Sequence, residues 1–299
     1  MNTKVVISLG ENAVFERDSE YTDKIEKEAF RNASKMIVSL INEGYDVNIV
    51  LGCEAHINNE VCSADINSML YDNARLAQEK YGKKFTEFLN NELEKAGIER
   101  KAEYITPILK VDSKDRAFKN LATYVGNFYS KADSKKLSRI KGYKMKEVLG
   151  KGFRRVVASP IPKGISNEEA FETDNILVAG AGIAYSEEGK PIDCLIEKDF
   201  TASLIADYLD ADCLLNLTDV EYVYINFKSA KRIGVRRMTY SEAERHFIHG
   251  EFEVSTMLPK VEAAMKFVYS NGNRRSIVSS LCKAVDAMHL KTGTIIVYI

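Results

Sequence analysis

Val5-Val6-Ile7-Ser8-Leu9-Gly10-Glu11-Asn12 is the stretch of sequence that decides the fold class of this chain. Its first five residues are mostly apolar and β-branched, which predicts a buried strand, and Gly10 begins the turn that ends it. A helical pattern starts at Asp23, repeats its apolar residues on one face and stops at Gly44. A second apolar run at residues 47–51 predicts another strand. Strand, helix and strand in this order indicate an α/β protein with parallel strands.

The same alternation continues along most of the chain. Thr239 and Glu242 have the spacing of a capping box, which predicts the start of one helix. The other expected strands are at residues 104–111, 176–179, 192–196, 213–217, 277–279 and 294–299, and the other expected helices are at 66–77, 85–96, 201–209, 259–268 and from 280 to about 290. The sequence therefore predicts a three-layer α/β/α sandwich around a mainly parallel sheet.

The alternation fails between residue 112 and about residue 165. This segment is polar and rich in lysine and arginine, and it is too long to be an unstructured loop in a compact domain. We therefore predict an inserted subdomain, called the arm below. Its basic residues suit either a solvated face or a lid over an anionic ligand, and composition does not separate the two.

Composition argues against several classes of partner. The 299 residues include 42 Lys+Arg and 43 Asp+Glu, a formal net charge of −1, so no long-range field favours nucleic acid or an anionic membrane. No segment approaches the ~20 apolar residues of a membrane span, and the first apolar run is too short for a signal peptide. The 5 cysteines are scattered without a Cys-x-x-Cys pair, which predicts a reduced, cytoplasmic compartment.

Three glycine-containing turns follow predicted strands. They are Gly10-Glu11-Asn12, Gly52-Cys53-Glu54 and residues 179–182, which include Gly180 and Gly182. Ligands of open α/β sheets bind at the carboxyl ends of strands, where glycine lets backbone amides approach phosphate oxygens. Each turn also suits an ordinary strand-to-helix connection. No Walker loop or complete dinucleotide fingerprint occurs.

Lysines stand at the ends of two other loops. Lys198-Asp199 precedes a predicted helix, and Lys260 begins another. Two lysines held by one aspartate can neutralise a transferring phosphoryl group, although a surface salt bridge has the same composition. Thr218-Asp219-Val220 ends a strand, where it suits either a nucleotide contact or a turn cap. His246 and His249 suit an exposed helix face better than a metal site, so we predict no metal held by protein ligands.

Five blocks of the sequence match one known family in the right order. They are residues 5–12, 150–162, 196–199, 217–220 with 223–226, and 257–264. On these blocks the sequence resembles carbamate kinase, of the amino-acid-kinase superfamily, along essentially its whole length. The resemblance implies one domain over residues 1–299, with an acid-substrate half at 1–190 and a nucleotide half at 191–299. The arm, at about 116–165, would cover the substrate.

The resemblance also implies an activity and a set of site residues. The family makes ATP and carbamate from ADP and carbamoyl phosphate with Mg²⁺, usually as a homodimer, and a role in arginine metabolism is expected. Lys198 and Lys260 would neutralise phosphate charge, and Asp199 would hold them. Gly10, Asn12, Gly52, Gly180 and Gly182 would border the acid substrate or the phosphoryl group, and Thr218, Asp219, Val220 and Met257 would border the nucleotide.

The departures from the family pattern gather on the acid-substrate side. Glu11 and Glu54 replace glycines, Cys53 replaces an asparagine, Thr123 replaces the arm lysine, and residues 179–182 replace a four-glycine turn. Loss of one preorganised donor typically lowers a rate ~10² to 10³-fold. A carboxylate ~5 Å from an anionic substrate adds roughly 3 kcal/mol of repulsion at an effective dielectric of ~20. Both glutamates would be harmless if they turned outward to solvent.

Three functions remain open at this point. The first is a carbamate-kinase-type phosphotransferase that binds ATP or ADP with Mg²⁺. The second is a catalytically silent paralogue that keeps the fold as a nucleotide-binding partner or regulatory subunit. The third is a kinase for a different acid substrate. The carboxyl-terminal blocks favour the first function, and the changes at Glu11, Cys53, Glu54 and Thr123 motivate the other two.

Overall fold

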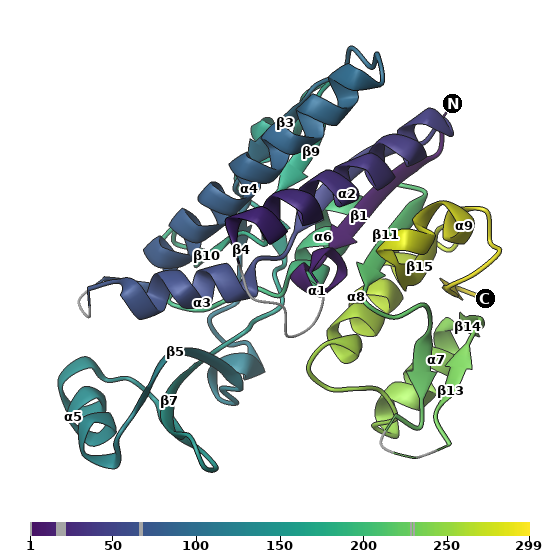
Figure 1. Cartoon of the computed structure of the whole chain (residues 1–299). Coiled ribbons are helices and arrows are strands. Elements are labelled where there is room, and N and C mark those ends of the chain that lie inside the picture. Colours follow the sequence, from purple (N-terminus) through teal and green to yellow (C-terminus); the bar gives the residue numbers. More distant parts are fainter. Residues whose placement is uncertain (1, 16–21, 66–67, 228, 230) are drawn as a thin grey trace.

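An eight-stranded sheet forms the centre of the molecule (Figure 1). The computed structural model describes residues 2–15, 22–65, 68–227, 229 and 231–299. In spatial order the strands are β14 (Arg237–Thr239), β16 (Thr294–Val297), β15 (Arg275–Ser280), β11 (Cys213–Thr218), β1 (Lys4–Leu9), β2 (Asp46–Leu51), β9 (Ile176–Ala179) and β3 (Ala102–Ile105). Every neighbouring pair is parallel except β15 with β16. The predicted mainly parallel sheet is confirmed.

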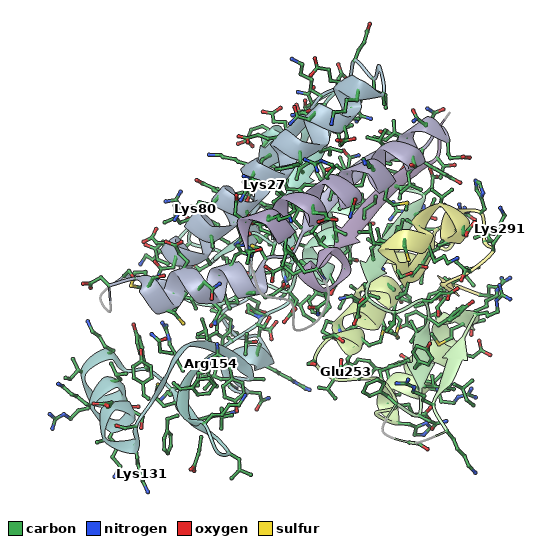
Figure 2. The ribbon with its side chains drawn as sticks, in the orientation of Figure 1. Lys27, Lys80, Lys131, Arg154, Glu253 and Lys291 are labelled. Carbon is green, nitrogen blue, oxygen red and sulfur yellow. The ribbon has the colours of Figure 1, made fainter. Side chains whose placement is uncertain are left out.

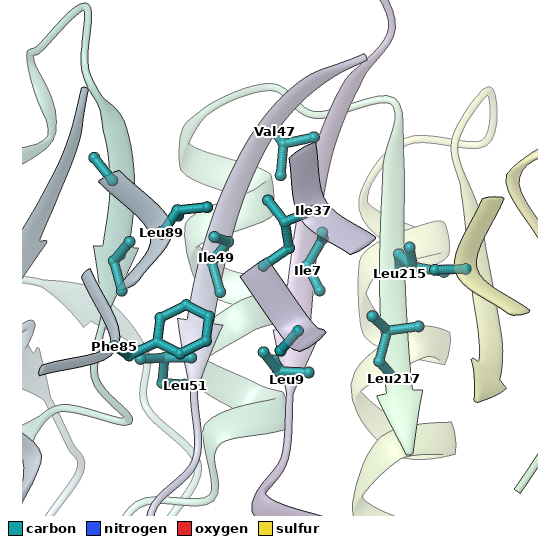
Figure 3. Packing of buried hydrophobic residues seen from close by; sticks show 14 of the residues in the cluster. Ile7, Leu9, Ile37, Val47, Ile49, Leu51, Phe85, Leu89, Leu215 and Leu217 are labelled. Atoms are coloured by element: carbon teal, nitrogen blue, oxygen red, sulfur yellow. The ribbon is translucent and has the colours of Figure 1, made fainter. Parts of the chain in front are cut away.

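Helices cover both faces of this sheet. On one face lie α2 (Asp23–Asn42), α4 (Leu70–Lys95) and α9 (Ala284–Met288); on the other lie α6 (Lys198–Tyr208), α7 (Tyr240–Ile248) and α8 (Met257–Ser270). Strand β1 serves both layers because successive side chains point to opposite faces. Ile7 and Leu9 pack toward Ile37 of α2 and Phe85 of α4, as Figure 3 shows, whereas Val6 packs in the α6 and α8 layer. The three-layer prediction is therefore also confirmed.

The arm has a sheet of its own and projects from the body beneath α3 (Figure 1). Its elements are β5 (Thr123–Tyr129), α5 (Lys131–Lys141), β6 (Met145–Val148) and β7 (Gly152–Val157), with β7 in the middle of an antiparallel sheet. A second small sheet joins β4 (Ile108–Lys110) to β8 (Gly164–Ile165) and β10 (Ile183–Tyr185). The basic segment is thus folded, as predicted.

Several short elements complete the chain. They are α1 (Glu11–Val14), α3 (Glu54–Ser63), the 3₁₀ turns Arg116–Phe118, Glu168–Phe171 and Leu281–Lys283, and the hairpin of β12 (Val223–Ile225) with β13 (Ile233–Val235). The capping box of Thr239 and Glu242 is present at the start of α7. Within the described ranges, none of the helices combines the length and apolar character needed to cross a membrane.

The structure makes four corrections to the predicted elements. No strand forms at residues 192–196, because Asp193 lies in a loop and accepts hydrogen bonds from the first N–H groups of α4, at Leu70 and Tyr71. The strand predicted at 104–111 is two strands in different sheets, β3 and β4. The helices predicted at 66–77 and 85–96 are one helix, α4, and Ile66 lies outside the described residues.

The fourth correction concerns where two helices of the second layer begin. Helix α6 begins at Lys198 rather than at Thr201, and α8 begins at Met257 rather than at Pro259. Proline is tolerated in the first turn of α8 because no backbone N–H there has a partner within the helix. The first change brings Lys198 and Asp199 into the first turn of α6, and the second makes Lys260 the fourth residue of α8.

Candidate active site

Lys198, Asp199 and Lys260 form one buried ion cluster. Lys198 Nζ donates to Asp199 Oδ1 at 2.8 Å, and Lys260 Nζ donates to Asp199 Oδ2 at 3.1 Å. Ser8 Oγ, from β1, donates to Asp199 Oδ1 at 2.6 Å. The three charged residues are only 2% to 6% exposed. Two helix starts, at α6 and α8, therefore bring both lysines to one carboxylate, an arrangement that separate surface salt bridges would not give.

Burial and neighbouring charge together set the ionisation of this cluster. Burial opposes ionisation of Asp199, but Lys198, Lys260 and Ser8 outweigh it and lower the pKa of Asp199 below its ordinary value. Burial also opposes the charge on Lys198, but Asp199 and Glu54 outweigh it and raise the pKa of Lys198. Burial, helped by the charge of Lys198, lowers the pKa of Lys260. Two lysines against one aspartate leave a buried excess of positive charge, which an anionic ligand would compensate.

A cavity of about 350 Å³ opens over the cluster. Its lining comes from the turn after β1, from α1, from the carboxyl end of β11 and from the starts of α3, α6 and α8. The lining residues are Gly10, Glu11, Asn12, Ala13, Glu54, Ala55, Glu197, Lys198, Asp199, Leu217, Thr218, Ser255, Thr256 and Lys260. Ligands of parallel α/β sheets bind at this edge, so the cavity is the candidate active site.

Two of the predicted glycines make room for Lys198. A Cβ on Gly52 would stand 2.4 Å from Lys198 Cδ, and a Cβ on Gly10 would stand 3.0 Å from Lys198 Cε. The lysine side chain therefore crosses the ends of β1 and β2 at a place that only glycine leaves open. Close approach, rather than backbone conformation, requires glycine at these two positions.

Glu11 turns into the protein. Its Oε2 accepts a hydrogen bond from the backbone N–H of Ala55 at 2.7 Å, and its Oε1 lies 2.5 Å from His56 Nδ1. The side chain is 5% exposed, and burial raises the pKa of Glu11 although the bond to His56 opposes that rise. The alternative in which Glu11 faces solvent is therefore wrong.

His56 connects Glu11 to a second carboxylate. Its Nε2 lies 3.3 Å from Glu26 Oε1, and Glu26 in turn pairs with Lys84 of α4. Burial would lower the pKa of His56, but Glu11 and Glu26 outweigh it and raise that pKa. The two carboxylates thus favour the protonated imidazole, and the imidazole holds the Glu11 carboxylate in place.

Glu54 and Glu197 bring further negative charge to the cavity. Glu54 is exposed, yet it lines the cavity, and its Oε1 is 3.0 Å from the point where a Cβ on Gly52 would stand. Burial, with the charge of Glu54, raises the pKa of Glu197 to about 7. Glu11 and Glu54 therefore make the amino-terminal side of the cavity acidic. The side at α6 and α8 contains the two lysines, and Glu197 lies directly before Lys198 at the start of α6.

The other predicted site residues are placed less uniformly. Thr218 lines the cavity, whereas Asp219 and Val220 follow it beyond the end of β11, and Met257 begins α8 with a buried side chain. Cys53 is buried before α3. Gly180 and Gly182 pack against Gln78, which accepts from the Gly182 N–H at 2.7 Å. Thr123 begins β5 in the arm and lies outside the cavity lining.

Sequence reasoning missed several polar residues at this site. Ser8, Glu197, Ser255 and Thr256 were not predicted as site residues, nor was His56. Glu253, labelled in Figure 2, accepts hydrogen bonds from the backbone N–H groups of Ser255 and Thr256 at 3.0 and 2.6 Å. Burial opposes its ionisation, but hydrogen bonds from the hydroxyl groups of Ser255 and Thr256, together with those from their backbone N–H groups, outweigh burial and lower the pKa of Glu253 to about 2. A carboxylate four residues before the first residue of α8 was the signal for this hydrogen-bonded loop.

The arm is fastened to the helix that borders the cavity. Asn58 Oδ1, from α3, accepts from the Gly126 N–H at 2.9 Å and from the guanidinium of Arg154, which Figure 2 labels on the arm. Arg154 Nε also donates to the Gly126 carbonyl at 2.8 Å. Among the residues that the structure describes, no group of three or more His, Cys, Asp or Glu side chains suits a metal ion.

Comparison with known proteins finds a matching family model, similar sequences and similar solved structures. The model of the amino acid kinase family matches residues 3–279. A carbamate kinase from Clostridium perfringens is 35% identical, covering 98% of this chain and 99% of its own, and one from Pyrococcus horikoshii has the same identity and coverage. The solved structure of a carbamate kinase from Giardia lamblia bound to AMP-PNP is 29% identical, covers 100% of this chain and 99% of its own, and superposes with a TM-score of 0.91.

Proposed function

Because the chain belongs to the amino acid kinase family, we propose that it is a carbamate-kinase-like phosphotransferase that makes ATP and carbamate from ADP and carbamoyl phosphate. The observation that carries this proposal is the buried cluster of Lys198, Asp199 and Lys260 in a cavity at the carboxyl ends of the central strands. The chain is an enzyme of the kinase class on this proposal.

The cluster suits the chemistry of phosphoryl transfer. Transfer forms a bond between phosphorus and a terminal phosphate oxygen of ADP, and it breaks the bond between phosphorus and a carbamate oxygen. Charge then spreads over the three equatorial oxygens, so fixed cations are the main help that a protein can give. Lys198 and Lys260 supply those cations, and Asp199 with Ser8 holds them at fixed positions.

Substrates would bind on two sides of this cluster. Gly10, Asn12 and Gly52 would border the acid substrate, together with Gly180 and Gly182. The nucleotide would lie toward Thr218, Asp219, Val220 and Met257 at the end of β11 and the start of α8. Mg²⁺ would be held by the nucleotide phosphates rather than by a set of protein ligands, and its chemistry is to neutralise phosphate charge.

Other parts of the proposal concern organisation and cellular context. Residues 1–190 would form the acid-substrate half and residues 191–299 the nucleotide half. The arm, at about 116–165, would cover the substrate, and its fastening to α3 through Asn58 supports this because α3 begins at the cavity. We further propose a homodimer, a cytoplasmic location and a role in arginine metabolism.

The alternatives of a silent paralogue and of a kinase for another acid are not favoured. Similarity to carbamate kinases extends over 98% of the chain, and the phosphate-neutralising lysines are both present and both paired with Asp199.

A coupled assay of ATP formation from ADP and carbamoyl phosphate tests the proposal. We expect turnover by the wild-type chain and its loss, by about 10³-fold, in Lys198→Ala. Lys266→Ala is the matched control, because Lys266 is an exposed lysine of α8 outside the cavity lining, and it should keep wild-type turnover. Calorimetric titration with ADP separates binding from chemistry. Absence of both ADP binding and ATP formation would contradict the proposal.

A further inference from the structure

Resting on the proposed function for the identity of the substrate, we infer that Glu11 is a specificity-determining residue, because its carboxylate fills the anion position at the N-terminus of α3. An acyl phosphate must compete with this built-in carboxylate or bind beside it. The inference therefore concerns how tightly the acid-substrate side of the cavity holds an anion, and it leaves the phosphoryl-transfer cluster unchanged.

The backbone places Glu11 directly in front of a helix end. Glu11 follows the turn at the end of β1, and Ala55 belongs to the first turn of α3, next along the sheet edge. First-turn N–H groups have no partner within their helix and carry partial positive charge, so they bind anions. The residue before α3, Cys53, supplies no side-chain cap. Glu11 Oε2, 2.7 Å from Ala55 N, is the anion that the helix end receives.

His56 fixes the Glu11 carboxylate at the start of α3. Its Nδ1 is 2.5 Å from Glu11 Oε1, while its Nε2 is 3.3 Å from Glu26 Oε1. The imidazole thus bridges a carboxylate of the cavity lining and a carboxylate of α2. With one oxygen on the Ala55 N–H and the other on His56, the Glu11 carboxylate is held at both ends and is nearly inaccessible to solvent.

A substrate anion in the same cavity would meet this fixed charge. Glu11 and Lys198 line one cavity, so an oxygen drawn to Lys198 approaches the carboxylate as well. Two like charges about 5 Å apart, at an effective dielectric of about 20, lower affinity by on the order of 10²-fold, which is an upper limit here because His56 offsets part of the Glu11 charge. Glu54 at the rim adds to the repulsion, and the Ala55 N–H that could offset it is already used.

Calorimetric titration of the full-length protein with inorganic phosphate at pH 7.5 tests this inference without requiring turnover. We expect Glu11→Gly to bind phosphate at least about tenfold more tightly than wild type, because it frees the Ala55 N–H and His56. Glu11→Gln keeps the side-chain volume and removes the charge, so a smaller gain is expected. It also serves if the glycine variant does not fold. In the coupled assay, the KM for carbamoyl phosphate should fall with the gain in phosphate affinity, while the KM for ADP stays constant.

Glu26→Gln is the matched control. It removes the other carboxylate on His56 but leaves Glu11 on the Ala55 N–H, so phosphate affinity should stay at the wild-type value. Unchanged phosphate affinity in a folded Glu11 variant, or an equal gain in Glu26→Gln, would overturn the inference. Failure of the proposed function looks different, since no variant would then form ATP from carbamoyl phosphate, and the phosphate titration would still decide the role of Glu11.

Discussion

The two sides of the cavity each contain a buried carboxylate, and they use it in opposite ways. At the start of α6, Asp199 holds two lysines side by side and leaves an excess of positive charge for a ligand. At the start of α3, the Glu11 carboxylate already binds the backbone N–H of Ala55 and the imidazole of His56, so neither group is left to bind a ligand anion. A buried acid therefore prepares a site for anions only when the bases around it outnumber it.

Removing the charge of Asp199 should have the largest effect, a loss of folding stability on the basic side of the cavity. Asp199→Asn leaves two buried lysines without their counter-ion, which should cost about 4 kcal/mol of folding free energy. Urea denaturation measures the loss. Ser8→Ala, which removes only a hydroxyl donor to Asp199, should cost about 1 kcal/mol. Equal losses in the two variants would mean that the ion cluster is not organised by charge.

Lowering the pH should remove the stabilising contribution of the same cluster. The folded-state pKa of Asp199 lies below the ordinary 3.8, so its stabilising contribution is present above pH 3.8 and is lost as pH falls through the folded-state value. Acid unfolding followed by circular dichroism should therefore be less steep in Asp199→Asn than in the wild-type chain. An identical acid transition in both proteins would contradict this expectation.

Loss of the second lysine should affect catalysis most and binding less. Lys260→Ala removes one fixed cation from the transferring phosphoryl group, so kcat should fall by about 10² to 10³-fold. ADP affinity, measured by calorimetry, should fall by a smaller factor. The steady-state assay shows whether the loss is in kcat, and a change confined to the KM for ADP would show that Lys260 only binds nucleotide.

A methyl group added at Gly52, where the Lys198 side chain passes the end of β2, should displace Lys198 without removing its charge. In Gly52→Ala the new Cβ would stand 2.4 Å from Lys198 Cδ, so the lysine must shift. Misplacement of a catalytic group by about 1 Å lowers a rate by on the order of 10²-fold, and we expect a loss of that size in kcat. Gly164→Ala is the control, because its Cβ meets only Lys110 Cδ, at 3.7 Å. Wild-type kcat in Gly52→Ala would show that Lys198 does not need its present path.

The smallest expected effect is the pH dependence that Glu197 gives to binding of an anion in the cavity. Its pKa is about 7, so raising the pH from 6 to 8 adds one negative charge beside Lys198. The KM for carbamoyl phosphate should rise by about threefold over this range, because the cavity repels the anion more strongly. Glu197→Gln should flatten the profile, and an unchanged profile in that variant would assign the dependence to another group.

The sequence allowed prediction of those parts that depend on local pattern. Strands such as β1 and helices such as α2 followed from apolar periodicity, and the capping box of α7 followed from spacing. Lys198, Asp199 and Lys260 were predicted because loop ends next to strands carry chemistry in α/β folds. Their mutual geometry still required the structure, since 61 residues separate Asp199 from Lys260.

The direction of the Glu11 side chain and the loop at residues 192–196 were not predicted, for physical reasons. The side chain of Glu11 could turn outward or inward at equal local cost, and its partner His56 is 45 residues away. The apolar run at residues 192–196 has strand propensity, but Asp193 is needed as a cap for α4 and the segment stays a loop. Such outcomes depend on tertiary hydrogen bonds that no local window of sequence contains.

The KM of carbamoyl phosphate in Glu11→Gly, compared with the KM of ADP in the same preparation, tests the difference between the two sides most directly. If Glu11 limits anion binding while the cluster of Lys198, Asp199 and Lys260 performs transfer, the first constant falls by about tenfold and the second stays at its wild-type value. Constants that both stay unchanged, or that shift together, would contradict this division of the cavity.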